Sequence, residues 1–116
     1  MSVLKKLDLL SMGRLKTTTI TVDGGDIIIS ELGATDSSSL FADPSNRDDK
    51  GDLKMSNFGP ALVARCVVDE EGQRLFSDEE ATQLGRLRTD LFGKMLMGAL
   101  DVNGLSERSQ DEAIKN

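Results

Sequence analysis

The sequence predicts an α+β fold: a short N-terminal helix and β-hairpin, a long acidic loop, short strands and a largely helical C-terminal half. Three observations predict it. Apolar residues alternate around a Gly-Gly turn near the N-terminus, a Ser- and Asp-rich stretch follows, and apolar residues then recur at helical spacing. With 116 residues, the chain can bury a sizeable core. We expect one domain built from residues 1–32, 33–57 and 58–116.

The first 32 residues predict a helix followed by a hairpin. Residues 15–22 and 26–32 are rich in Thr, Ile and Val, and Asp23-Gly24-Gly25 between them supplies a turn. Gly13 is expected to end the preceding helix. That helix is indicated by apolar side chains at spacings of three and four, namely Val3, Leu4, Leu7 and Leu10.

Residues 33–57 are dominated by Ser, Asp, Asn and Gly, and we expect them to form a long, exposed and flexible acidic loop. A calcium loop of the EF-hand type can be aligned with Asn46 at the first position. That alignment fails because it places Lys50 at a ligand position, and an ammonium group cannot coordinate a cation.

Residues 62–80 predict a strand, a turn, a return strand and a helix start. Residues 62–68 are rich in β-branched side chains, and residues 74–76 would return alongside them. Between them, Asp69-Glu70-Glu71-Gly72 is typical of a solvated turn, with Gly72 at positive φ; a weak cation site is the less favoured alternative. Ser77 and Glu80 form a capping box, so a helix should begin at Asp78.

The C-terminal part is predicted to be helical, with an apolar arc wider than one small sheet requires. Asn103-Gly104 should end the main helix, and residues 106–114 should form a short polar one. We interpret part of the arc as a partner-binding face, and ordinary core packing is the alternative. If it is an interface, a Leu91→Asp or Met95→Asp chain should stay folded and lose its partner. The proposed face comprises Leu87, Leu91, Phe92, Met95, Leu96, Ala99 and Leu100.

Composition argues against several functions. The formal net charge of −6 disfavours nucleic acid and anionic membranes as partners, and no stretch is apolar enough for a membrane span or a secretion signal. The sequence contains no histidine and no phosphate-binding glycine motif, so we expect no enzyme activity, no metal and no cofactor. The single cysteine, Cys66, should be a small buried hydrophobe in a cytoplasmic protein.

Residues 58–116 resemble the tail assembly chaperones of long-tailed, siphovirus-type bacteriophages and their prophages. The resemblance lies in the run 62–68, the turn 69–72 and the helix start 75–79. It continues in residues 100–106, Leu-Asp-Val-Asn-Gly-Leu-Ser, and in the terminal Lys115-Asn116. The N-terminal hairpin is also expected in such a family.

The resemblance implies a chaperone that binds the tape-measure protein, recruits major tail subunits, forms homo-oligomers in the host bacterial cytoplasm and is absent from the virion. It also implies a longer product made by a −1 ribosomal slip, with which Ile114-Lys115-Asn116 is compatible. Two other hypotheses remain. One is a small structural head–tail or tail component of the virion, and the other is a host protein-binding regulatory module.

Overall fold

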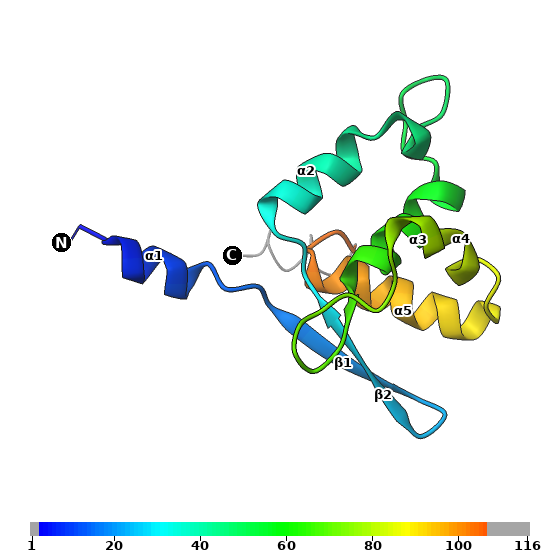
Figure 1. Ribbon diagram of the computed structural model, residues 1–116. Helices are drawn as coiled ribbons and strands as arrows, with labels where there is room; N and C mark the ends of the chain where they lie inside the picture. The colour runs from blue at the N-terminus through cyan, green and yellow to red at the C-terminus, as the bar shows by residue number, and fades with distance from the viewer. Residues whose placement is uncertain (1–2, 107–116) are drawn as a thin grey trace.

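A computed structural model describes residues 3–106 of the chain. Its strands form an antiparallel sheet in the order β1 (Thr17–Val22), β2 (Gly25–Ser30) and β3 (Val67–Val68). The predicted α+β class is confirmed, because helices alternate with and then follow these strands (Figure 1). The α-helices are α1 (Lys6–Met12), α2 (Ala34–Ala42), α3 (Met55–Cys66), α4 (Ala81–Leu84) and α5 (Thr89–Val102).

The predicted hairpin is confirmed. Strands β1 and β2 pair in register from Thr17 opposite Ser30 to Val22 opposite Gly25. Asp23 and Gly24 between them have φ values of 49° and 83°, which is the left-handed geometry of a type I′ turn. The backbone twist of a type I′ turn matches the right-handed twist of the two strands that it joins. Because the two-residue turn fixes which residues are paired, the local sequence determines the register of β1 and β2.

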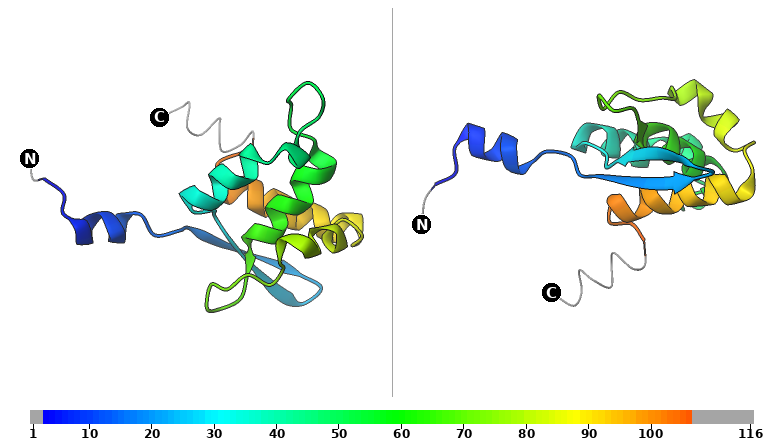
Figure 2. Two further views of the ribbon diagram at one scale, coloured as in Figure 1. Left: turned by 45° about the horizontal axis from the view of Figure 1, so that its top comes forward. Right: turned by 90° about the horizontal axis from the view of Figure 1, so that it is seen from below.

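The predicted N-terminal helix is also present, as α1. The carboxylate of Asp8 accepts a hydrogen bond from the backbone N–H of Lys5 at 2.9 Å, which satisfies a free donor at the start of the helix. At its end, the N–H of Gly13 donates to the carbonyl of Leu9, also at 2.9 Å. Figures 1 and 2 show α1 projecting away from the rest of the molecule.

The expectation of a long loop over residues 33–57 was wrong. This segment contains α2, a 3₁₀ helix at Pro44–Asn46 and the first residues of α3. The polar residues act as local hydrogen-bonding groups: the side chain of Asn46 is buried and donates to the carbonyl of Leu40 at 3.1 Å. Arg47 donates to the carbonyl of Phe41 through two nitrogens, at 2.9 and 3.1 Å. The composition resembled that of a loop because these residues cap and turn the chain.

The predicted strand at residues 62–68 was wrong for its first five residues. Leu62 to Cys66 form the end of α3, and only Val67 and Val68 are extended. Phe58, Leu62 and Cys66 are buried and lie four residues apart, which is helical spacing. Their packing outweighs the β-propensity of the run, and the helix tolerates Pro60 in its interior.

The turn after β3 is confirmed, whereas the return strand is not. Gly72 has φ 83°, and the carboxylate of Asp69 accepts hydrogen bonds from the N–H groups of Glu71 and Gln73 at 2.8 and 2.9 Å. Residues 74–76 contribute only a single bridge, between Arg74 and Val68. The chain therefore leaves the sheet directly after the turn.

The helix start at Asp78 is confirmed, but the helix does not run on to residue 102. The carboxylate of Glu80 accepts from the N–H of Ser77 at 2.8 Å, as a capping box requires. A 3₁₀ turn at Asp78–Glu80 leads into α4, residues 85–88 break the helix, and α5 follows. Gly104 (φ 70°) and the bond from the N–H of Leu105 to the carbonyl of Leu100 end α5 in a Schellman motif. The predicted helix at 106–114 lies almost wholly outside the described residues.

The core lies between α3, α5 and the sheet. One cluster of buried residues joins α2, α3, β2 and α5, and the other joins α3, β3, α4 and α5. The first comprises Ile29, Leu40, Phe58, Leu62, Cys66 and Ala99, and the second comprises Val63, Ala64, Val67, Leu84 and Met95. Helix α5 contributes to both, so it is central to the packing of the chain.

Helix α5 approaches the sheet most closely at Gly98. A Cβ atom there would lie 2.7 Å from Cδ1 of the fully buried Ile29, so an added side chain would force the Ile29 side chain to move within the core. At Gly93, on the same helix, an added Cβ would meet no described atom within 4 Å. The two glycines therefore have different roles: Gly98 permits close packing, and Gly93 leaves open space.

This difference predicts opposite effects of substitution. Gly98→Val is expected to lower the free energy of unfolding by about 1–3 kcal/mol through overpacking. Gly93→Ala is expected to raise it by about 0.5–1 kcal/mol, because alanine costs less backbone entropy in a helix. Urea unfolding followed by circular dichroism measures both. Equal effects at the two positions would show that α5 does not lie this closely against β2.

Candidate protein-binding surfaces

The predicted partner-binding face of α5 packs largely within the chain itself. Met95 is only 3% exposed and Ala99 is fully buried. Leu91, Phe92, Leu96 and Leu100 are half-buried and pack against the two core clusters. Leu87, at 39% exposure, precedes α5 and is the member of the set that solvent reaches best. The structure thus brings six of the seven residues together in or against the core, and their binding of a partner stays a prediction.

Leu87 borders a small apolar hollow between α3 and α5, which we call the α3–α5 hollow. It measures about 290 Å³ and is lined mainly by Met55, Pro60, Leu87 and Phe92. Met55 and Leu87 are both substantially exposed, so the rim of the hollow is apolar. A single large apolar side chain from a partner helix could occupy it.

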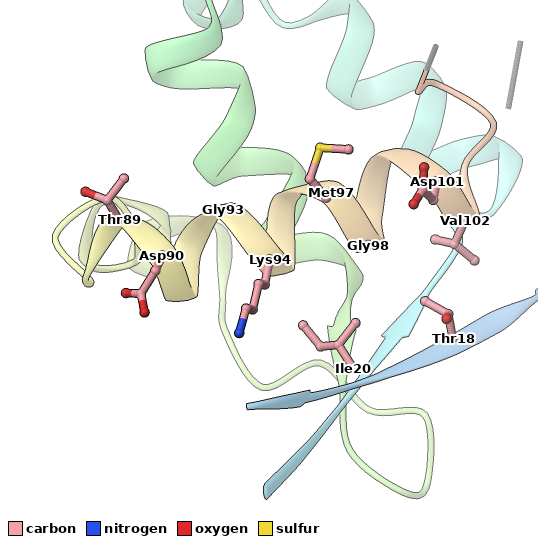
Figure 3. Close-up of a pocket in the computed structure, with 10 residues that line it drawn as sticks. All are labelled: Thr18, Ile20, Thr89, Asp90, Gly93, Lys94, Met97, Gly98, Asp101 and Val102. Carbon is pink, nitrogen blue, oxygen red and sulfur yellow. The ribbon is translucent and has the colours of Figure 1, made fainter. Parts of the chain in front are cut away.

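Helix α5 forms a larger hollow with the sheet, the α5–β1 groove, of about 740 Å³ (Figure 3). Ile20 and Thr18 of β1 face the helix in this view, and Lys94 and Val102 approach from α5. Gly93 and Met97 extend the lining along α5, and Met97 is 53% exposed. Asp90 and Asp101 lie toward the two ends of the helix. The groove therefore combines an apolar centre with charged side chains.

Helix α1 presents a third apolar surface. None of its seven residues, all of which the structure describes, is buried. Leu7 is 78% exposed, and large apolar side chains are exposed on either side of it. Together with its flanking residues, this segment exposes Val3, Leu4, Leu7, Leu9, Leu10, Met12 and Leu15. Such a concentration of apolar surface is typical of a segment that packs against another molecule.

A polar hollow of about 500 Å³ between α2, α3 and α4 holds the clearest charge network. The carboxylate of Asp78 lies 2.7 Å from Nη2 of Arg74 and 3.5 Å from Nε of Arg65. The hydrogen bond from Arg74, followed in weight by the charge of Arg65, keeps the pKa of Asp78 below its ordinary value. Arg65 also donates to the carbonyl of Asp36 at 2.8 Å. These ion pairs tie α3 to the segment before α4.

Cys66 is fully buried, as expected from the sequence, and burial raises the pKa of its thiol to about 11. The amide of Asn103 approaches its sulfur at 3.5 Å. Within residues 3–106, no cluster of metal-ligating side chains is found. In the same part of the chain, no helix combines the length and apolar character of a membrane span.

Comparison with known proteins identifies the fold. No family model matches the chain, and no curated protein matches its sequence. The solved structure of the bacteriophage HK97 tail assembly chaperone superposes with a TM-score of 0.56 and 18% sequence identity. The match covers 83% of this chain and 91% of that one. The chain has the fold of a phage tail assembly chaperone.

This match confirms the fold implied by the resemblance of residues 58–116. Because it covers 83% of the chain, it must also include part of the segment before residue 58. The similarity of fold therefore extends beyond residues 58–116, the part of the chain that carried the sequence resemblance.

Sequence reasoning missed the α5–β1 groove and the isolation of α1. The signal for the groove was weak: Gly93 and Met97 lie four residues apart, on the side of α5 away from Leu91 and Met95. The amphipathic pattern of α1 was recognised, but a pattern cannot tell which surface covers the apolar stripe. Both surfaces depend on how distant segments are placed.

Proposed function

We propose that this chain is a bacteriophage tail assembly chaperone. It binds the tape-measure protein, recruits major tail subunits during assembly in the host bacterial cytoplasm, and is not retained in the virion. The observation that carries this proposal is the similarity to the HK97 tail assembly chaperone over 83% of the chain. The role is one of binding rather than catalysis, and copies of the chain self-associate to line a long partner.

We assign the contact with the tape-measure protein to the α3–α5 hollow. Two residues of the predicted partner-binding face line this hollow, namely the exposed Leu87 and the half-buried Phe92. Met55 of α3, which was not part of the predicted face, also lines it. A long helical polypeptide presents an apolar side chain once or twice per turn, and one such side chain fits a hollow of about 290 Å³. The net charge of −6 keeps complexes with an apolar partner in solution.

Co-expression tests the binding step. The full chain should hold the tape-measure protein of its own tail gene cluster in the soluble fraction and co-purify with it. Leu87→Asp should raise the Kd by about tenfold or more, because it places a carboxylate in an apolar contact. Leu75→Asp is the matched control, since Leu75 is a comparably exposed leucine outside the hollow. Equal binding by the two variants would remove the hollow from the proposal.

Mass spectrometry of purified particles tests the chaperone role itself. The chain should be abundant in lysates during assembly and absent from finished virions. Its presence in virions in fixed ratio to the tail proteins would instead identify a structural tail component. The same lysates would reveal a longer product of a −1 slip at Ile114-Lys115-Asn116, which is part of this proposal.

A further inference from the structure

The exposed helix α1 requires a covering surface. A helix of seven residues is too short to persist alone in water, where isolated helices need roughly 12–15 residues even to be marginal. Helices of this length are held by tertiary packing of an apolar face. The apolar face of α1, formed by Leu7 and Leu10 with Leu4 just before the helix, lies in solvent. Packing against another surface would bury this apolar stripe.

The charge distribution indicates what kind of surface completes it. The first 16 residues contain four basic residues, Lys5, Lys6, Arg14 and Lys16, and one acidic residue, Asp8. The rest of the chain contains ten basic and nineteen acidic residues. A basic, apolar arm is thus attached to an acidic body. Attraction between them favours docking of the arm on a body of this same kind.

The α5–β1 groove is the surface on the body that fits the arm best. At about 740 Å³ it is larger than the α3–α5 hollow, its centre is apolar, and Met97 in its lining is half exposed. Gly93 provides open space where a side chain would otherwise stand. Its lining also contains charged side chains: Asp90, which lies 3.3 Å from Nε of Arg88, with Lys94 and Asp101. The groove therefore matches the apolar face of α1, and the net acidic charge of the body attracts the basic arm.

The connection between α1 and β1 directs the arm away from its own groove. The backbone N–H of Lys16 donates to the carboxylate of Glu31 at 2.8 Å, and its carbonyl accepts from the N–H of Glu31 at the same distance. Lys16 is therefore held in line with the sheet, and only residues 13–15 could reverse the chain. All the views show α1 continuing outward from β1 (Figures 1 and 2). A groove on another copy is reached without that reversal.

We propose that α1 of one copy of this chain packs into the α5–β1 groove of a second copy. Each copy then offers one arm and one groove, and because the arm points away from its own groove, the contact can propagate from copy to copy. This inference rests on the proposed self-association and names the surfaces that produce it. It leaves the α3–α5 hollow free for the tape-measure protein.

Sedimentation velocity and light scattering of the full chain test the two halves of the contact separately. Leu7→Asp combined with Leu10→Asp should weaken self-association by more than about 100-fold, because two large side chains lose their burial. Ser11→Asp is the control for added charge: it adds one carboxylate to α1, half the charge change of the double variant, without removing an apolar side chain. In the groove, Gly93→Phe should block docking, whereas Gly93→Ala should permit it. Circular dichroism should show all of these chains folded.

Cysteine crosslinking distinguishes a second copy from the chain's own groove. A Leu7→Cys chain mixed with a Met97→Cys chain should form a mixed disulfide when a mild oxidant such as diamide accepts the two electrons. Buried Cys66 gives little background because its thiol is shielded and its pKa is raised. A chain carrying both substitutions that crosslinks only within itself would overturn the proposal.

Two further outcomes would also overturn it: a wild-type chain that remains monomeric, or one whose arm variants associate as strongly as the wild type. A monomeric chain that sediments with phosphatidylglycerol vesicles through Leu7 and Leu10 would assign the arm to a membrane surface instead. Binding of the tape-measure protein is measured independently through Leu87. A monomeric chain that still binds it would refute the arm proposal and the proposed self-association, and would leave the proposed binding of the tape-measure protein intact.

Discussion

Replacing Met95 with aspartate is expected to unfold the chain. Met95 is 3% exposed and belongs to the core cluster that joins α3, β3, α4 and α5. A carboxylate placed there would be buried among apolar side chains, which costs several kcal/mol beyond the lost packing. Domains of this size are stable by about 5–15 kcal/mol, so one such change can remove most of that stability.

Circular dichroism and urea unfolding measure this effect, with Met97→Asp as the control. Met97 lies two residues away on α5 but is half exposed, so its substitution should change the free energy of unfolding by about 0.5 kcal/mol or less. Met95→Ala, which is more readily purified, should lose about 2–5 kcal/mol. A Met95→Asp chain that melts normally but no longer binds its partner would instead support the interface predicted from the sequence.

Phe58→Ala is expected to lower the free energy of unfolding by about 3–5 kcal/mol. Phe58 is 2% exposed and packs in the cluster that joins α2, α3, β2 and α5. Its ring centroid lies 5.2 Å from that of Phe41 on α2, at an interplanar angle of 44°. Such ring pairs add about 0.5–1.5 kcal/mol beyond the area they bury. The substitution should therefore loosen α2 as well as α3.

Urea unfolding measures the loss, and hydrogen exchange locates it. Met55→Ala, on the same helix but half exposed, is the control and should change stability by about 0.5 kcal/mol or less. Amide protection should fall in α2 of the Phe58→Ala chain before it falls in β1 and β2. Unchanged protection of α2 would show that the contact between Phe41 and Phe58 does not hold this helix in place.

The elements predicted correctly from the sequence are those whose signals are local. Asp23-Gly24 determines the hairpin turn through positive φ values, and the pair Ser77 and Glu80 determines a helix start through two hydrogen bonds across one turn. Gly104 ends α5 for the same kind of reason. Each of these signals depends on residues within a few positions of one another. The local conformation that it predicts therefore depends little on packing against distant parts of the chain.

The elements predicted wrongly are those whose conformation depends on distant contacts. The run 62–68 was predicted as a strand because it contains Val63, Val67 and Val68, but Leu62 and Cys66 are buried against α5 and β2, and that packing favours the helix. Residues 33–57 have the composition of a loop, yet Asn46 and Arg47 satisfy carbonyl groups of the preceding helix α2. Composition cannot show whether a polar side chain points into solvent or back to the chain.

The candidate binding surfaces also combine features that local sequence predicts with features that depend on distant contacts. The α+β class, the hairpin, the caps and the apolar stripes of α1 and α5 could be predicted from the amino-acid order, because they follow from short-range periodicity and backbone chemistry. Which stripe is covered became clear from the packing of the folded chain: Met95 and Ala99 are buried by α3, α4 and the sheet, whereas Leu7 and Leu10 remain in solvent. The side chains of an apolar stripe are more stable when they are removed from water. The packing of distant elements determines whether they are buried within the chain or remain exposed for a partner to cover.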